Sequence, residues 1–132
     1  MNQRQLISRA RIGVTLSFLT HGFISSSFFA RIPDYKARLE LSNSVLGLCL
    51  LASSAGVLAA LGPVGRLAAQ RGSSAVLTKS SYLLVFIAPF VGISFNAISF
   101  AAILFLFGVA IAAQDVAMNT HGVTLEQKSG AR

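Results

Sequence analysis

The residues that could carry out chemistry in this sequence are few, and the first group lies inside an apolar stretch. Ser17, His21 and Ser25 follow one another at steps of four, which places them on one face of a helix. Inside a bilayer, a histidine on such a face can bind a solute or carry a proton. The other interpretation is a stripe for close helix packing, in which the histidine is hydrogen bonded. Both interpretations of His21 stay open, and the two serines favour packing.

A second polar face lies toward the end of the chain, with steps of four, three and four: Gly108, Ala112, Asp115 and Asn119. Asp115 is the only acidic residue inside an apolar run, about 26 Å from the start of that run and hence near the membrane boundary. Three interpretations are open for this carboxylate. It can form a gate or structural ion pair with Arg66 or Arg71, act as a proton or substrate carboxylate, or be a plain interfacial residue.

No group of residues has the spacing of a catalytic centre. His21 and His121 lie at opposite depths, no nucleophile and base are paired, and the phosphate-binding G-x-x-x-x-G-K-[ST] pattern is missing. The single cysteine, Cys49, cannot form an internal disulfide or a Cys/His metal cluster. We therefore expect no enzyme activity, no metal and no cofactor.

The polar residues interrupt four long apolar runs, and these runs define the fold class. The composition is 54% hydrophobic and 11% charged, whereas a soluble domain carries about a quarter charged residues. Each run has roughly 20 residues, enough for a helix to cross a hydrocarbon core of about 30 Å. Since a lipid-exposed backbone must satisfy its own hydrogen bonds, we predict an all-α polytopic membrane protein in contact with the lipid bilayer. The expected spans are about 12–30, 45–64, 76–95 and 98–118.

The connections between the runs differ in character. The link 31–44 is long and of mixed charge, the link 65–75 is basic, the link 96–97 is a tight turn, and a polar tail follows from 121 to 132. Ser42 or Asn43 suits the N-cap of the second helix. In that helix, a face of small residues and a proline predicts close packing: Ser53, Gly56, Ala60 and Pro63.

The net charge of +7 comes from 11 Lys and Arg against 4 Asp and Glu. The basic residues lie between the apolar runs without interleaved aromatic residues, so we expect no nucleic-acid partner. By the positive-inside rule, the distribution of these basic residues indicates which connections are cytoplasmic. Eight fall on one side and three on the other: Arg4, Arg9, Arg11, Arg66, Arg71, Lys79, Lys128 and Arg132 against Arg31, Lys36 and Arg38. We expect the first side, with both termini, to be the cytoplasmic side of the cell inner membrane.

The link after the second run carries a family resemblance. Its sequence, GRLAAQRGSS from 65 to 74, resembles the G-x-L-A-D-R-x-G-R-R loop of the major facilitator superfamily, with matches at Gly65, Leu67, Ala68 and Gly72. The resemblance implies a gate loop that includes Gly65, Arg66, Arg71 and Gly72. Ala69 stands where the family has its aspartate, and Leu104 stands where it often has an arginine. The segment 114–121 is similar to bacterial inner-membrane members.

This resemblance implies that residues 1–132 form part of an N-terminal transporter domain, the first four of about twelve helices. The implied function is transport of a small solute, with proton coupling left open. His21, Ser25, Gly108 and Ala112 would then form one wall of a central site. With one wall only, we expect a fragmentary chain that self-associates and gives no saturable uptake by itself. Two alternatives are a complete dimeric transporter like the small multidrug-resistance proteins, and a membrane subunit that does not transport.

Overall fold

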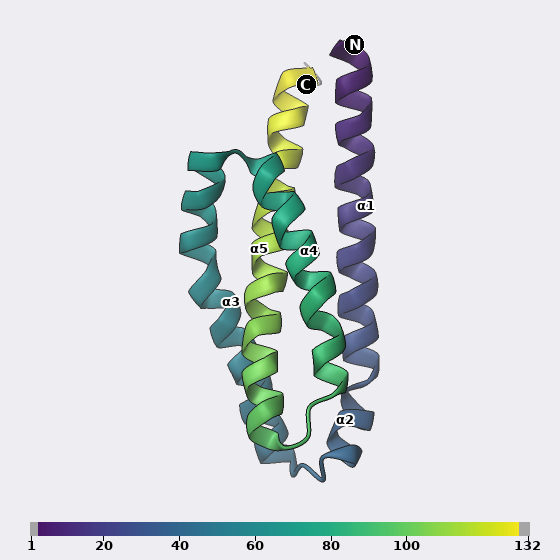
Figure 1. Cartoon of the computed structure of the whole chain (residues 1–132), viewed down its shortest axis with the longest axis vertical. Coiled ribbons are helices and arrows are strands. Elements are labelled where there is room, and N and C mark those ends of the chain that lie inside the picture. Colours follow the sequence, from purple (N-terminus) through teal and green to yellow (C-terminus); the bar gives the residue numbers. More distant parts are fainter. Residues whose placement is uncertain (1–2, 130–132) are drawn as a thin grey trace.

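The structure, a computed structural model, describes residues 3–129 and is helical through most of that range (Figure 1). Arg132, counted above among the cytoplasmic basic residues, lies outside the described residues. The elements follow in the order α1 (Gln3–Ala30), α2 (Ile32–Arg38), α3 (Asn43–Arg71), α4 (Ser73–Gly92) and α5 (Ala97–Ser129). Among them α1, α3, α4 and α5 are long and apolar enough to cross a membrane, which confirms the all-α polytopic fold class.

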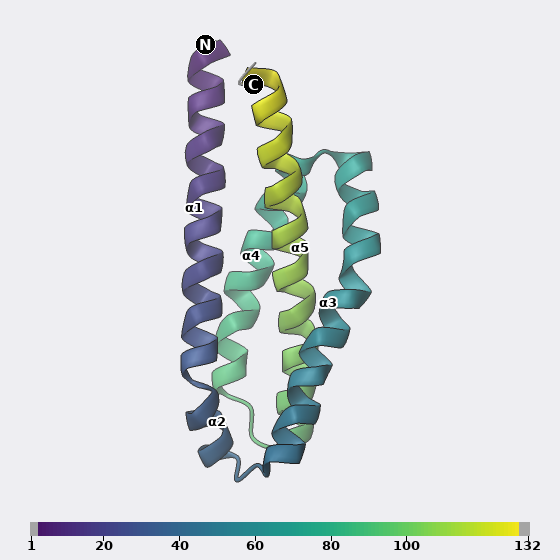
Figure 2. The same ribbon diagram turned by 180° about the vertical axis from the view of Figure 1, so that it is seen from behind.

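The four long helices run up and down, so that the two ends of the described chain lie together at one end of the bundle (Figures 1 and 2). The short helix α2 lies at the opposite end. The expected N-cap of α3 is confirmed at Ser42, and Asn96 caps α5 in addition. The hydroxyl of Ser42 accepts a hydrogen bond from the backbone N–H of Val45 at 3.2 Å, and the side-chain oxygen of Asn96 accepts one from the N–H of Ser99 at 2.7 Å. These bonds satisfy N–H groups at the starts of α3 and α5 that have no partner within the helix.

The helices extend farther than the apolar runs, and this corrects three expectations. The predicted basic link 65–75 is helical as far as Arg71, and the only break is at Gly72, whose φ of 85° favours glycine. The predicted link 31–44 contains α2, and the predicted polar tail continues α5 to Ser129. Polar residues beyond the hydrocarbon core can remain helical because their side chains reach water, so hydropathy gives the length of a span and not that of its helix.

Helices α3 and α5 pack backbone against backbone. A Cβ added to Gly56 would overlap the carbonyl oxygen of Phe105, and one added to Gly108 would overlap the carbonyl oxygen of Ser53. Such approach requires small residues on both helices. The packing prediction for Gly56 is therefore confirmed. The expectation that Gly108 lines an open site is wrong, because α3 covers that glycine.

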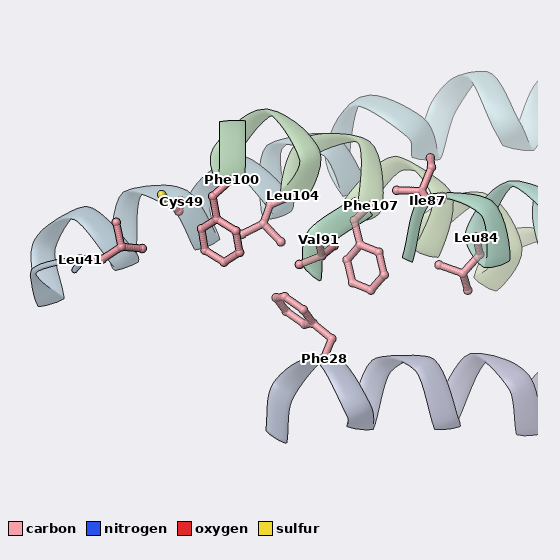
Figure 3. Packing of buried hydrophobic residues seen from close by; sticks show 10 residues of the cluster. Phe28, Leu41, Cys49, Leu84, Ile87, Val91, Phe100, Leu104 and Phe107 are labelled. Carbon is pink, nitrogen blue, oxygen red and sulfur yellow. The ribbon is translucent and has the colours of Figure 1, made fainter. Parts of the chain in front are cut away.

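Helix α1 is attached more loosely. Most of the side chains described in 8–30 face outward, and the buried Phe28 packs on Phe107 of α5, with ring centroids 5.0 Å apart (Figure 3). Its end is also tied down through α2. There the guanidinium of Arg38 donates to the carbonyl oxygen of Gly92, at the end of α4, and to the hydroxyl of Ser94 at 3.1 Å. A cation at a helix C-terminus is favourable because the carbonyl groups there carry partial negative charge.

Candidate functional site between α1 and α5

The polar face of α1 points into the bundle. The Nδ1 atom of His21 and the hydroxyl oxygen of Ser25 are both buried, whereas Leu19 on the opposite face is 64% exposed. The face that the steps of four define is thus turned toward the other helices. Ser17 lies on the same face, and its hydroxyl donates to the carbonyl oxygen of Gly13 in its own helix at 2.9 Å. The hydroxyl of Ser17 is therefore already engaged within α1.

Gln114 of α5 meets this face and is fully buried. Its side-chain nitrogen donates to the backbone carbonyl of Ser17 at 3.4 Å and to the hydroxyl of Ser81 of α4 at 3.2 Å. A carbonyl can only accept, so the amide must turn its nitrogen toward Ser17. The amide oxygen, Oε1, consequently faces away from these two partners, and it is buried with no hydrogen-bond partner.

Three buried polar atoms in this region have no partner: Nδ1 of His21, Oγ of Ser25 and Oε1 of Gln114. Along α1, His21 and Ser25 come between Ser17, which contacts Gln114, and Phe28, which contacts Phe107. Each buried donor or acceptor without a partner costs about 1–3 kcal/mol. Three such atoms on α1 and α5 therefore leave hydrogen-bonding capacity that the described residues do not use.

An apolar cavity of about 240 Å³ opens between α1, α2 and α4, toward the α2 end of the bundle. Aromatic rings and one cation supply much of its lining: Phe23, Phe28, Arg31, Tyr35 and Phe107. Ser27 and Tyr35 are the hydroxyl residues of its lining, and none of the three unpartnered atoms belongs to a lining residue. The cavity is thus a neighbour of the polar site rather than part of it.

The structure separates Asp115 and Asn119 from the polar face of α1. Both are exposed on α5, where the side-chain nitrogen of Asn119 donates to the backbone carbonyl of Asp115 at 2.9 Å and to its carboxylate at 3.3 Å. Within the described residues, Asp115 forms no ion pair with Arg66 or Arg71. Of the interpretations left open for Asp115, the structure therefore gives no support to the ion pair with the basic link.

The expected gate-loop residues end α3 and remain outward-facing. Gly65, Arg66, Arg71 and Gly72 are all exposed. The neighbour of this region on α5 is His121, whose Nδ1 lies 3.0 Å from the hydroxyl of Ser73. Figures 1 and 2 show α3 diverging from α5 toward this end. An open groove of about 440 Å³ lies there, lined by Ala68, Ala69, Gly72, Ser73, Ser74, Thr120, His121 and Thr124.

Gln114 is a residue of this region that the sequence analysis does not single out. A signal was present: Phe100, Phe107 and Gln114 follow at steps of seven, so Gln114 is a polar residue on the most buried apolar face of α5. No group of three His, Cys, Asp or Glu side chains that could hold a metal occurs in the part of the chain that the structure describes.

Comparison with known proteins gives three relatives. The chain is 31% identical to an uncharacterised MFS-type transporter of Yersinia pestis over 120 residues, which are 91% of the chain and 31% of that protein. It is 30% identical to the membrane protein MosC of Rhizobium meliloti, over 90% of the chain and 29% of MosC. It is 26% identical to the uncharacterised transporter y4wD of Sinorhizobium fredii, over 96% of the chain and 33% of that protein. The chain thus spans about a third of the length of the curated relatives it matches, and no family model or solved structure matches it.

Proposed function

We propose that this chain, a distant homologue of MFS-type transporters, forms part of a solute pathway through the membrane in a transporter of that type. The observation that carries the proposal is the group of buried polar atoms without partners on His21, Ser25 and Gln114. Polar groups inside a bilayer are costly and mark pathways for solutes or protons. Here they lie on α1 and α5, within segments that carry no charged side chain, 12–30 and 97–114.

The homology supports a role in transport, without assigning that role to particular residues. Two of the three relatives are transporters by name, and they align with nine tenths or more of this chain. Among the chain's own residues, His21 is the titratable group of the site, so it is the residue that proton coupling would use. The chain contributes one wall of the pathway, and further helices or a second copy contribute the opposite wall. We accordingly expect no saturable uptake by the purified chain in vesicles.

We also propose that both ends of the chain are cytoplasmic, because eight of the eleven basic residues fall on their side. The two ends of the chain lie at the same end of the bundle, which supports a shared side of the membrane (Figure 1). In intact cells, a cysteine introduced by Lys36→Cys should react with a membrane-impermeant thiol reagent, and one introduced by Ser74→Cys should not. The reverse pattern would invert the topology.

The pathway itself is tested by its access to water. Two single-cysteine variants, Ser25→Cys and Leu19→Cys, are made in a chain whose native cysteine is removed by Cys49→Ala. In membrane vesicles of both orientations, an impermeant thiol reagent should modify the cysteine at position 25 and not the one at position 19. The thiol at position 25 would face a hydrated path, whereas the one at position 19 would face lipid.

The control position is matched, since Leu19 and Ser25 lie on the same helix less than two turns apart but on opposite faces. Modification at both positions would indicate that α1 is not embedded as proposed. No modification at position 25 from either side would assign the polar face to helix packing and refute the proposed function.

A further inference from the structure

The chemistry of the three unpartnered atoms restricts what the site can bind, and this inference rests on the proposed function. The orientation of the Gln114 amide is fixed because its nitrogen donates to the carbonyl of Ser17 and to the hydroxyl of Ser81, which leaves its oxygen buried with no partner. An amide oxygen only accepts hydrogen bonds. A molecule that satisfies it must therefore present an O–H or N–H group.

The other two atoms add hydrogen-bonding capacity without a fixed charge. The hydroxyl of Ser25 can donate and accept, and the Nδ1 atom of His21 does either according to its tautomer. From Ser17 at the level of Gln114 to Ser25, α1 rises by about 12 Å, with His21 halfway. One small molecule can reach all three levels only if it carries several polar groups along its length.

Charged side chains are absent from the helical segments that surround the site. The sequence has no Asp, Glu, Lys or Arg in 12–30 of α1, in 80–92 of α4 or in 97–114 of α5. The nearest charges in sequence point elsewhere: Asp115 is exposed and bonded to Asn119, and Lys79 lines an outer groove with Tyr82 and Phe86. A charged solute would thus be desolvated without a fixed countercharge, which costs several kcal/mol.

We propose that this site takes an uncharged solute that carries several hydroxyl or amide N–H groups, one of which donates to the oxygen of Gln114. His21 and Ser25 bind further polar groups of the same molecule. Gln114 then selects for donors, and the absence of fixed charge on the facing helices selects against ions. The solute replaces the hydrogen bonds that these three side chains otherwise lack.

The test measures protection of the Ser25→Cys thiol, in the Cys49→Ala chain, from the impermeant reagent. Three probes share one carbon skeleton: sorbitol is neutral, gluconate is anionic and glucamine is cationic. Sorbitol should slow the modification in a saturable manner, and the two ions should not. In the additional variant Gln114→Leu, protection by sorbitol should weaken about tenfold, the effect of one lost hydrogen bond in a buried site, while modification without solute continues.

The outcomes separate the two proposals. If the thiol reacts but gluconate or glucamine protects it as well as sorbitol does, the pathway stands and the proposed solute class is wrong. Failure of sorbitol to protect at any concentration that the vesicles tolerate also overturns the solute class. Unchanged protection in Gln114→Leu removes the assigned role of the amide oxygen. If the thiol does not react at all, the proposed function itself fails, and the inference fails with it.

Discussion

Helix α5 meets α3 and α1 in opposite ways. Against α3 it lies in backbone contact, with Gly56 and Gly108 seated on carbonyl groups of the facing helix. Against α1 it is held by side chains, chiefly by Phe107 on Phe28 and by Gln114 on the carbonyl of Ser17. The first interface leaves no room for a side chain, whereas the second leaves polar atoms without partners.

The difference indicates that the α3–α5 and α1–α5 pairs have different roles in the bundle. Lipid tails are as apolar as the side chains they surround, so helices gain little by burying apolar surface and associate through close packing and hydrogen bonds. The α3–α5 pair is held by backbone contact at Gly56 and Gly108 and can serve as a rigid wall. The α1–α5 pair keeps unused hydrogen-bonding capacity, which the proposed solute would use.

The largest effect is expected at the tight interface. Gly56→Ala should lower the free energy of unfolding by about 2–3 kcal/mol, because the new methyl group overlaps the carbonyl of Phe105 and forces the helices apart. Reversible unfolding by SDS in mixed micelles, followed by circular dichroism, measures this. The matched control is Gly62→Ala in the same helix, where a Cβ meets nothing within 4 Å. That control should be neutral or stabilise by up to about 1 kcal/mol, and equal effects of the two changes would contradict the backbone contact.

At the looser interface, the aromatic contact should have the next largest effect. Phe28→Ala removes a buried ring that packs on Phe107 and Tyr35 and should cost about 2 kcal/mol, less than a comparable change in a water-soluble core, since lipid can occupy the space. The same SDS titration measures it. Phe29→Ala is the control, because that neighbouring ring is 64% exposed and should change stability little. A larger loss for Phe29 than for Phe28 would mean that α1 is rotated.

The hydrogen bonds of Arg38, which connect α2 to the end of α4, should contribute less to stability. Arg38→Gln removes the cation from the carbonyl of Gly92 and weakens the tie between α2 and α4. We expect a loss of about 1 kcal/mol, seen in the SDS titration as well. Hydrogen exchange of the backbone amides should increase in 32–38 more than in α3. An equal increase of hydrogen exchange in all helices would show that the Arg38 hydrogen bonds do not hold this end of α1.

The smallest effect on stability is expected for Gln114→Leu, the substitution that should weaken solute binding. Gln114→Leu loses the two hydrogen bonds to Ser17 and Ser81 but also removes the buried oxygen that has no partner. These two effects offset each other, so the free energy of unfolding should change by no more than about 0.5 kcal/mol. A control, Gln114→Ala, leaves a void and should cost about 2 kcal/mol or more. If Gln114→Leu destabilises as strongly as Gln114→Ala, the amide is a structural link, and the contrast between the two interfaces disappears.

Much of the fold followed from the sequence alone, for reasons that concern single helices. The bilayer permits few backbone structures, so four apolar runs predict four helices. The steps of four place His21 and Ser25 on the same side of α1. Ser42 is recognisable at a helix start because its short side chain can accept from the first N–H groups, whereas the sequence predicts Asn96 only as part of a turn. These inferences need only the geometry of one helix at a time.

What only the tertiary structure decided is which neighbour each face meets. Periodicity placed Gly108 and Asp115 on one face of α5, yet α3 covers the glycine and leaves Asp115 exposed. The same periodicity could not show that Gln114 reaches Ser17 and Ser81, because that depends on how α1, α4 and α5 are rotated and inclined relative to one another. A sequence determines the pattern on each helix, whereas the partner of a polar atom is a property of two helices, fixed only by the crossing that close packing allows.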